Sequence, residues 1–338
     1  MKKVLFFATC AIALFASCQK TEVNYVGEPQ EIAFFAVNKT ATKAPHSTTN
    51  FPDDNMQVAA YLAAGGTAVG DFFTQTQFTK NGTYWTGSKY WPITASTINF
   101  LAVSEPVVED GETNPVSYAT TPFTAASATV TLDGDAQYDL MYAVGQGKCE
   151  PGLYPQVDMQ FRHSLTWLYF TVKANLAGKI KVNSITVNNT AVDGTLTITN
   201  SNATATTAVA TATATVGADW GTVTRNVSKA VPVSSAVECT TAGTAYPFGS
   251  LLVIPDGAAG ANLTATAKSF TINYTVDNGS TTTYEYTHEF NASWEMAKKY
   301  TYDISINLAG IAVNPTVAGW TDGNANDTSV TLAGSSAN

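Results

Sequence analysis

Residues 300–308 alternate strictly between apolar side chains and other ones, and this pattern limits what the chain can fold into. The apolar positions are two apart: Tyr300, Tyr302, Ile304, Ile306 and Leu308. Successive side chains of a strand point to opposite faces, so a period of two predicts a strand with one buried face. Shorter runs of the same period recur at 98–102, 128–132, 140–144 and 270–276. Beyond Cys18 no segment keeps a helical period, which predicts an all-β protein.

Turn residues between these runs predict how neighbouring strands are joined. Asn81-Gly82 and the Asp-Asn-Gly sequence at residues 277–279 are typical hairpin turns. The Thr-Gly-Ser sequence at residues 86–88 is expected to connect two short strands in the same way. Strands at such spacing are typical of β-sandwiches. Since 338 residues suggest two domains, we expect two antiparallel β-sandwich domains, residues 30–175 and 176–338.

Two of the expected strands depart from simple alternation. Residues 32–37 are apolar at both parities, which is typical of a strand that lies inside a sandwich. In residues 157–172 the apolar positions keep one parity as far as Trp167 and the other parity from Leu168 onward. A β-bulge or a crossing between sheets near Trp167 would explain this change.

The N-terminal segment, Met1–Cys18, is of a different kind. Two lysines precede an apolar run over residues 4–14, and an Ala-Ser pair stands directly before Cys18. This layout is typical of a secretory signal peptide, residues 1–17. The small residues predict cleavage before Cys18 and lipid on its sulfur, whereas an ordinary signal peptide with a chance cysteine is the alternative. The run is too short for a permanent membrane-spanning helix, and no other apolar run approaches the length that such a helix needs.

The charge and the remaining cysteines restrict partners and cross-links. Charged residues make up 13% of the chain and the net charge is −9, without a basic stripe, so we expect no nucleic-acid partner. Cys149 and Cys239 remain after the signal peptide and the acylated Cys18 are set aside. An exported protein can hold a disulfide, but pairing requires a close Cα–Cα approach. A bridge between these cysteines and two separate thiols therefore both stay open.

Patterns typical of catalysis, metal binding or cofactor binding are not found, so we do not expect an enzyme. The histidines His46, His163 and His288 are far apart, and no two have the spacing of metal ligands. We expect His163 and His288 to be core or rim residues of strands. Adjacent acids at residues 53–54 and 109–110 stand in expected loops, where calcium would need several more oxygen ligands. The chain has no nucleophile elbow and no Gly-rich phosphate loop.

Two sets of aromatic residues allow more than one interpretation. The Tyr-Trp pairs at residues 84–85 and 90–91 are either a sugar-stacking platform or anchors of the core and its rim. The core interpretation is favoured, because large aromatic side chains dominate protein cores. The tyrosines at 284 and 286 are expected to form cross-strand pairs with those at 300 and 302.

An ordered set of motifs runs along the mature chain behind Cys18. They are EIAFFAVN (31–38), ATKA (41–44), YWTGSKYWP (84–92), INFLAVSEP (98–106), YDLMYA (138–143), VDMQFRHSLTWLYFTV (157–172) and KKYTYDISINLAGIAV (298–313). Each motif alone is weak, but together their order and spacing resemble the fimbrillin family. These are the pilin-type lipoproteins with which Gram-negative anaerobes build type V pili.

The resemblance implies a fold, a location and a mode of assembly. It implies two transthyretin-like β-sandwiches, exported to the outer membrane as a lipoprotein anchored through Cys18. It also implies cleavage between Lys43 and Ala44 by a trypsin-like protease, which would remove residues 18–43 with the lipid and the first strand. A strand from another fimbrial subunit would then fill the groove, and the tail at residues 328–332 is a candidate donor.

The expected function is therefore that of a structural or adhesive subunit of a cell-surface fimbria, as stalk, tip or anchor. The alternative is a cell-surface glycan-binding lipoprotein, with a host protein or glycan as its partner, and a surface hydrolase is a third hypothesis. A removable first strand before a protease-sensitive loop favours the fimbrial subunit. An exposed coplanar aromatic row favours the glycan binder, and two acids facing each other across a cleft favour the hydrolase.

Overall fold

The structure is a computed structural model of the chain. It describes residues 30–38, 55–64, 66–108, 111–120, 123–175, 179–206, 216–224, 227–256, 268–277, 281–290, 293–307, 310–319 and 330–331. These residues form strands and one short 3-10 helix, η1 (Gly134–Ala136). None of the described helices is long and apolar enough to cross a membrane. The all-β prediction is confirmed.

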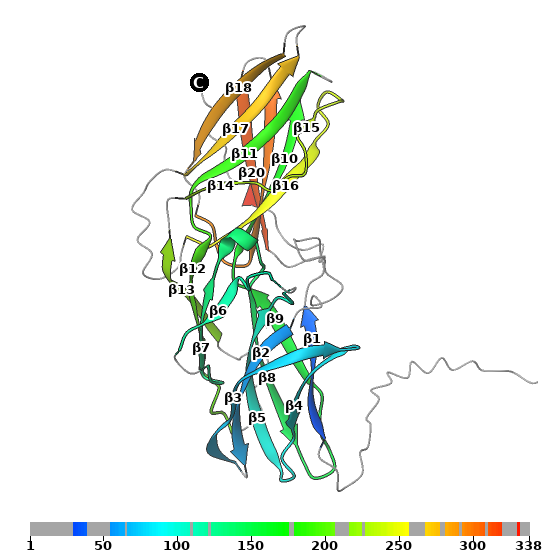
Figure 1. Ribbon diagram of the computed structural model, residues 1–338, viewed down its shortest axis with the longest axis vertical. Coiled ribbons are helices and arrows are strands. Elements are labelled where there is room, and N and C mark those ends of the chain that lie inside the picture. Colours follow the sequence, from blue (N-terminus) through cyan, green and yellow to red (C-terminus); the bar gives the residue numbers. More distant parts are fainter. Residues whose placement is uncertain are drawn as a thin grey trace, which may run out of the picture.

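A closed barrel of seven strands forms the lower half of the molecule in Figure 1, with the strand order β1-β4-β3-β2-β5-β8-β9. The strands are β1 (Glu31–Asn38), β2 (Asn55–Ala64), β3 (Thr67–Asn81), β4 (Tyr84–Tyr90), β5 (Ser96–Glu105), β8 (Met141–Cys149) and β9 (Val157–His163). Alternate residues of each strand point inward and build one apolar core. Phe34, Phe78 and Phe100 are fully buried in it.

A further four-stranded sheet, in the order β13-β12-β7-β6, adds a layer outside the barrel. Its strands are β6 (Val116–Tyr118), β7 (Ser127–Leu132), β12 (Asp193–Asn200) and β13 (Val216–Thr224). Strand β5 is buried along its whole length because it serves two cores. Phe100 belongs to the barrel core, whereas Leu101 belongs to the core shared with β7 and β12. The N-terminal half therefore has one more layer than a simple sandwich.

The upper half in Figure 1 is a sandwich of two sheets, β16-β10-β19-β20-β21 and β14-β11-β17-β18. Its strands are β10 (Thr166–Ala174), β11 (Ile180–Thr190), β14 (Val227–Ala230), β15 (Val237–Glu238), β16 (Tyr246–Val253), β17 (Lys268–Asp277), β18 (Thr281–Phe290), β19 (Lys298–Asn307), β20 (Gly310–Gly319) and β21 (Val330–Thr331). Strand β15 pairs with β11. The alternating residues of β19 are buried as predicted, and they face Phe270 and Ile272 of the opposite sheet.

The chain changes from one half to the other where the sequence changes parity. Strand β9 ends in the barrel at His163, and β10 begins in the upper sandwich at Thr166. The crossing between sheets, one of the two explanations offered, is therefore what the structure has. The chain then returns, because β12 pairs with β7 of the N-terminal half. Sheet pairing thus runs across the expected division between residues 175 and 176.

Strand pairing agrees with two predicted hairpins and corrects two other expectations. Strands β3 and β4 join at a turn where Gly82 has a φ of 65°, and β17 pairs with β18. Residues 86–88 do not form a turn, since β4 continues through them. The expected pairing of Tyr284 with Tyr300 is also wrong, because Tyr284 pairs with Tyr274 in one sheet and Tyr300 with Leu168 in the other.

Most pairs of strands are antiparallel, as predicted, but two pairs among the described strands are parallel. Strand β1 runs parallel to β9, and β10 runs parallel to β19. Parallel neighbours cannot be joined by a tight turn, so both pairs bring together segments that are far apart in the sequence. The first parallel pair places the N-terminal strand within the barrel.

Candidate functional site

Strand β1 closes the barrel, and it lies between β4 and β9 in the strand order. On one side it pairs antiparallel with β4, where Phe34 stands opposite Trp85. On the other side it pairs parallel with β9, where Phe34 stands opposite Val157. Both edges of β1 are therefore hydrogen-bonded, and its loss would leave two unpaired edges facing one groove.

The inner face of β1 supplies a central part of the barrel core. Ile32 and Phe34 are completely buried. The ring of Phe34 meets the rings of Phe78 and Phe100 edge to face, with centroids 4.8 and 5.0 Å apart. Burying such a side chain contributes about 1.5–3 kcal/mol, and edge-to-face pairs add about 0.5–1.5 kcal/mol. Removal of β1 would therefore uncover an apolar groove that another extended segment could fill.

The outer face of β1 corrects the prediction that this strand is buried on both faces. Phe35 is 40% exposed, and its ring lies 6.2 Å from that of Tyr84 on the neighbouring strand. The apolar outer residue packs along the surface of the barrel because no other layer covers that face among the described residues. The fully buried side chains of β1, Ile32 and Phe34, therefore share its inner face.

Polar contacts fix the position of β1 at its beginning. The Ser88 amide donates to the Glu31 carboxylate at 2.8 Å, and the Trp91 amide donates to the Gln30 carbonyl at 2.9 Å. Ser88 has a left-handed φ of 53°, and the β1–β4 register shifts beside it. A Cβ on Gly87 would lie 2.8 Å from the Phe78 ring. The residues expected to form a turn instead make an irregularity in β4 that receives β1.

Several predicted site residues lie outside the described residues, and two others are described. Cys18, Lys43 and Ala44 belong to the first group. Cys149 and Cys239 are both free thiols, and both are fully buried. They belong to different apolar cores, so no disulfide joins them, and the alternative of two separate thiols is what the structure shows. Burial raises the pKa of each thiol.

The aromatic residues weighed as a sugar platform serve the core. Trp85 and Trp91 are each only 3% exposed, and both belong to the barrel core. Tyr90 is exposed on the same strand, but the indole rings beside it point inward. The core interpretation is confirmed, and these residues form no exposed coplanar row.

The two described histidines are buried, as expected of core or rim residues. The His163 ring contacts the Asp139 carboxylate at 2.9 Å, which ties the end of β9 to the segment before β8. This pair was not predicted, because the two residues belong to different sequence motifs and nothing in their spacing brings them together. His288 on β18 lies beside Tyr286, and burial lowers its pKa.

Replacing His288 with Gln should weaken the loss of stability in acid. A histidine whose folded pKa is depressed stabilises the fold above its usual pKa of about 6.5, and this contribution is lost as the pH falls through the folded value. Urea unfolding at about pH 7.5 and about pH 5 measures the change. The difference between the two pH values should be smaller for His288→Gln than for the wild type. An equal difference in both proteins would contradict this prediction.

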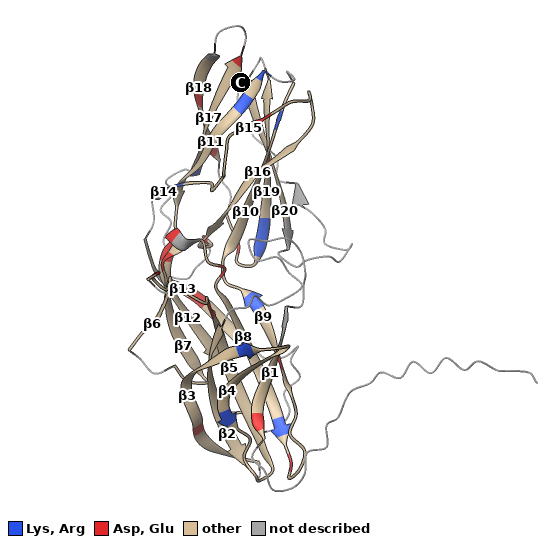
Figure 2. Cartoon of the chain, turned by 45° about the vertical axis from the view of Figure 1, so that its right-hand side comes forward, with Lys and Arg blue, Asp and Glu red and all other residues tan. Residues whose placement is uncertain are grey.

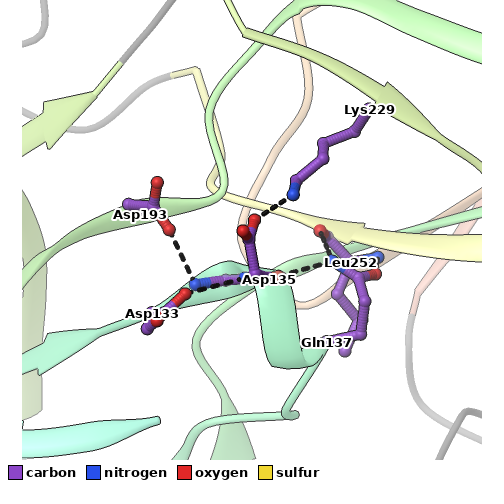
Figure 3. A network of polar contacts seen from close by, with 7 residues as sticks. Asp133, Asp135, Gln137, Asp193, Lys229 and Leu252 are labelled. Atoms are coloured by element: carbon purple, nitrogen blue, oxygen red, sulfur yellow. Dashed lines mark hydrogen bonds and ion pairs between the residues drawn. The ribbon is translucent and has the colours of Figure 1, made fainter.

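A polar network joins the two halves of the molecule around η1 (Figure 3). Asp133 and Asp193 accept the amides of Asp135 and Gly134 at 3.0 and 2.8 Å. The Lys229 ammonium on β14 pairs with the Asp135 carboxylate. The Gln137 carboxamide accepts the Leu252 amide of β16 at 2.7 Å and donates to its carbonyl at 3.3 Å. This network could not be predicted from the sequence, because its residues come from four separate segments.

These features define a class of protein: an all-β protein of stacked sheets whose own N-terminal strand completes a barrel. The fimbrillin-like family model matches residues 39–320, so the chain belongs to the fimbrillin-like family. The family is one of fimbrial structural proteins and not of enzymes. Membership gives the chain a fimbrial or adhesin-type role at the cell surface, in assembly with other fimbrial subunits.

Solved structures similar to this chain include proteins from species of Bacteroides and Parabacteroides. A protein described as a cell adhesion protein from Bacteroides ovatus has a TM-score of 0.50 and 14% identity, covering 88% of this chain and 100% of that one. One from Bacteroides uniformis has a TM-score of 0.48 and 20% identity, covering 86% and 98%. A fimbrial assembly protein from Parabacteroides distasonis has a TM-score of 0.44 and 10% identity, covering 90% and 99%. No curated protein sequence matches the chain.

Proposed function

We propose that the chain is a stalk, tip or anchor subunit of a fimbria that assembles by strand exchange at the groove under β1. A protease would cut between Lys43 and Ala44 and release residues 18–43, including the lipid on Cys18 and strand β1. The observation that carries this proposal is the position of β1. It is the strand that closes the barrel between β4 and β9, and it supplies Phe34 to the core.

The order of the chain makes such a release simple. Strand β1 ends at Asn38 and β2 begins at Asn55, so Lys43 stands between them. One cut there separates β1 covalently from the rest of the barrel without interrupting another described strand. The amides and carbonyls of β4 and β9 that face β1 would then lose their strand partners and form two open edges beside an apolar groove. An added strand from another subunit restores the hydrogen bonds and covers the apolar groove.

The C-terminal tail is the proposed donor. Within the tail only Val330 and Thr331 are described as a strand, β21, and they pair with Val317 and Thr316 at the edge of β20. So short a pairing costs little to release. Val330 and Leu332 are two residues apart, as Ile32 and Phe34 are, so both could face one groove.

Trypsin treatment of the native protein tests this function. We expect one early cut after Lys43, followed by oligomers that resist SDS and appear as a ladder on a gel. The variant Lys43→Ala should remain uncut at this position and should form no ladder, whereas a chain truncated after residue 327 should be cut without forming one. A protein that is cut at Lys43, loses residues 18–43 and stays monomeric would contradict assembly by strand exchange.

The lipid on Cys18 is a separate part of the proposal. We infer that it delivers the subunit to the outer membrane and that cleavage at Lys43 later releases it. Labelling of growing cells with radioactive palmitate should mark the wild type and leave Cys18→Ala unmarked. Equal labelling of the two proteins would contradict lipidation at this cysteine.

A further inference from the structure

Exposed apolar side chains gather at one end of the barrel. Among the described residues seven large apolar side chains are exposed, and four of them belong to segments at this end: Val69 at 62%, Tyr90 at 49%, Ile93 at 77% and Leu153 at 47%. We call these four residues the basal patch. The other three are Phe35, Val107 and Tyr284, which belong to other parts of the chain.

Strand pairing places three members of the basal patch around the start of β1. Tyr90 stands opposite Glu31, the first residue of β1. Ile93 follows Trp91, whose amide donates to the carbonyl of Gln30 at 2.9 Å. The Cys149 thiol lies 3.6 Å from the Thr94 carbonyl, so the end of β8 is beside the segment that holds Ile93. Leu153 pairs with Glu150 in the turn directly after Cys149.

Val69 joins the same end through the β2–β3 hairpin. Ala64, the last residue of β2, pairs with Ser96 at the start of β5 and with Thr67 at the start of β3. Val69 follows closely behind Thr67 on the same strand. The end of β2 and the starts of β5 and β1 all lie at the lower end of the molecule in Figure 1. The basal patch therefore lies at the end of the barrel where β1 begins.

The length of the preceding chain limits how far this end can be from a lipid on Cys18. Gln30 is the residue directly before β1, so only the short stretch between positions 18 and 30 separates the lipid from the barrel. At about 3.3–3.6 Å per residue, a fully extended chain of this length spans at most about 40 Å. The lipid would therefore keep the start of β1, where the basal patch lies, within about 40 Å of the membrane.

The chemistry of the patch fits the interface of a bilayer. Tyrosine is enriched at membrane interfaces, and interfacial binding strengthens with the apolar area buried at the boundary between headgroups and acyl chains. Lys89 and Lys148 at this end are accompanied by Glu31 and Glu150, so it has no basic cluster among the described residues. Figure 2 shows how thinly charged residues are spread over the strands. Association should therefore depend on apolar contact and not on anionic lipid.

We propose that the basal patch rests in the interface of the bilayer that holds the lipid on Cys18. The barrel end then faces the membrane, and the upper sandwich, with the β17–β18 hairpin, points away from it. The inference rests on the proposed lipidation, and it adds an orientation that the length of chain between Cys18 and β1 would not impose by itself.

Site-specific fluorescence on the lipidated full-length protein tests this orientation. An environment-sensitive label is placed on Ile93→Cys or Leu153→Cys, with Tyr284→Cys as the matched exposed control. Cys149 and Cys239 are fully buried, so they should not react in the folded protein. Neutral vesicles of phosphatidylcholine and phosphatidylethanolamine should shift the emission at 93 and 153 to the blue and protect it from an aqueous quencher. The label at 284 should not change, and high salt should not reverse the effect.

The outcomes separate the proposal from the functions on which it rests. Protein that floats with the vesicles while the labels at 93 and 153 stay accessible to the quencher would overturn the orientation and leave lipidation intact. A protein that does not float would overturn both. The label at 93 could instead shift to the blue without vesicles, once trypsin has produced oligomers. That result would overturn the membrane contact and assign the patch to a contact between subunits. Ladder formation by Ile93→Ser should equal that of the wild type, because the patch lies outside the groove.

Discussion

Replacing Phe34 with Ala should lower the free energy of unfolding by about 3–5 kcal/mol, the range for a fully buried aromatic residue. Phe34 has no exposed surface, and its ring fills the space between Phe78 and Phe100. The surrounding rings belong to different strands of a closed barrel and cannot all move into the cavity. Urea denaturation, followed by tryptophan fluorescence, measures the loss.

Phe35 provides a matched control on the same strand. The variant Phe35→Ala removes the same number of atoms from a side chain that is 40% exposed and has Tyr84 as its aromatic neighbour. We expect a loss of about 1 kcal/mol or less, as for a surface substitution with one partner. Equal losses for the two variants would mean that the inner face of β1 is not what anchors the strand.

Replacing Trp220 with Ala should lower the free energy of unfolding by roughly 3–5 kcal/mol, as for Phe34→Ala. Trp220 lies on β13, is fully buried, and donates from its indole nitrogen to the Ser164 carbonyl at 2.7 Å. That carbonyl lies between β9 and β10, where the chain crosses from the barrel to the upper sandwich. The indole therefore connects the four-stranded sheet to this crossing. Calorimetry should show a lower melting temperature for the whole transition.

The variant Trp220→Phe separates packing from hydrogen bonding at this site. It keeps most of the apolar volume and loses the donor, which should cost about 1–3 kcal/mol because the carbonyl stays buried. A negligible effect of both variants would contradict the assignment of β13 to the layer that covers the barrel.

Alternation of apolar residues was enough to predict the fold class and many of the strands. Strand β19 shows why, since each buried apolar residue in its pattern faces the opposite sheet across one core. The hairpin at Asn81-Gly82 was also predictable, because its turn requires a positive φ that glycine adopts at no steric cost. Both patterns depend only on residues that are neighbours in the sequence, so they can be recognised without knowledge of the tertiary structure.

The arrangement of layers could not be predicted from the same pattern. A period of two tells which side of a strand is buried but not which segment covers it. Strand β12 alternates like any half-buried strand, and nothing in it reveals that its partner is β7, from a distant part of the sequence. The parallel pairing of β1 with β9 is equally remote, and it is the pairing that creates the groove.

The candidate site was predicted in part. The apolar first strand was predicted from its composition. Which of its faces is buried could not be predicted, because that depends on the layers packed around it, and no described layer covers Phe35. The Asp139–His163 contact and the joint around Gln137 were missed because each joins residues from separate segments. Cys18, Lys43 and Ala44 lie outside the described residues, and their roles remain proposals.

The central claim is that the groove vacated by β1 is refilled by another strand. Hydrogen–deuterium exchange at β4 and β9 tests this claim most directly. The amides of these strands that face β1 should be protected in the intact chain, exchange rapidly once residues 18–43 are released, and be protected again in the assembled polymer. Amides between β11 and β17 in the upper sandwich serve as the unchanged reference. A polymer in which the β4 and β9 amides still exchange rapidly would contradict the account.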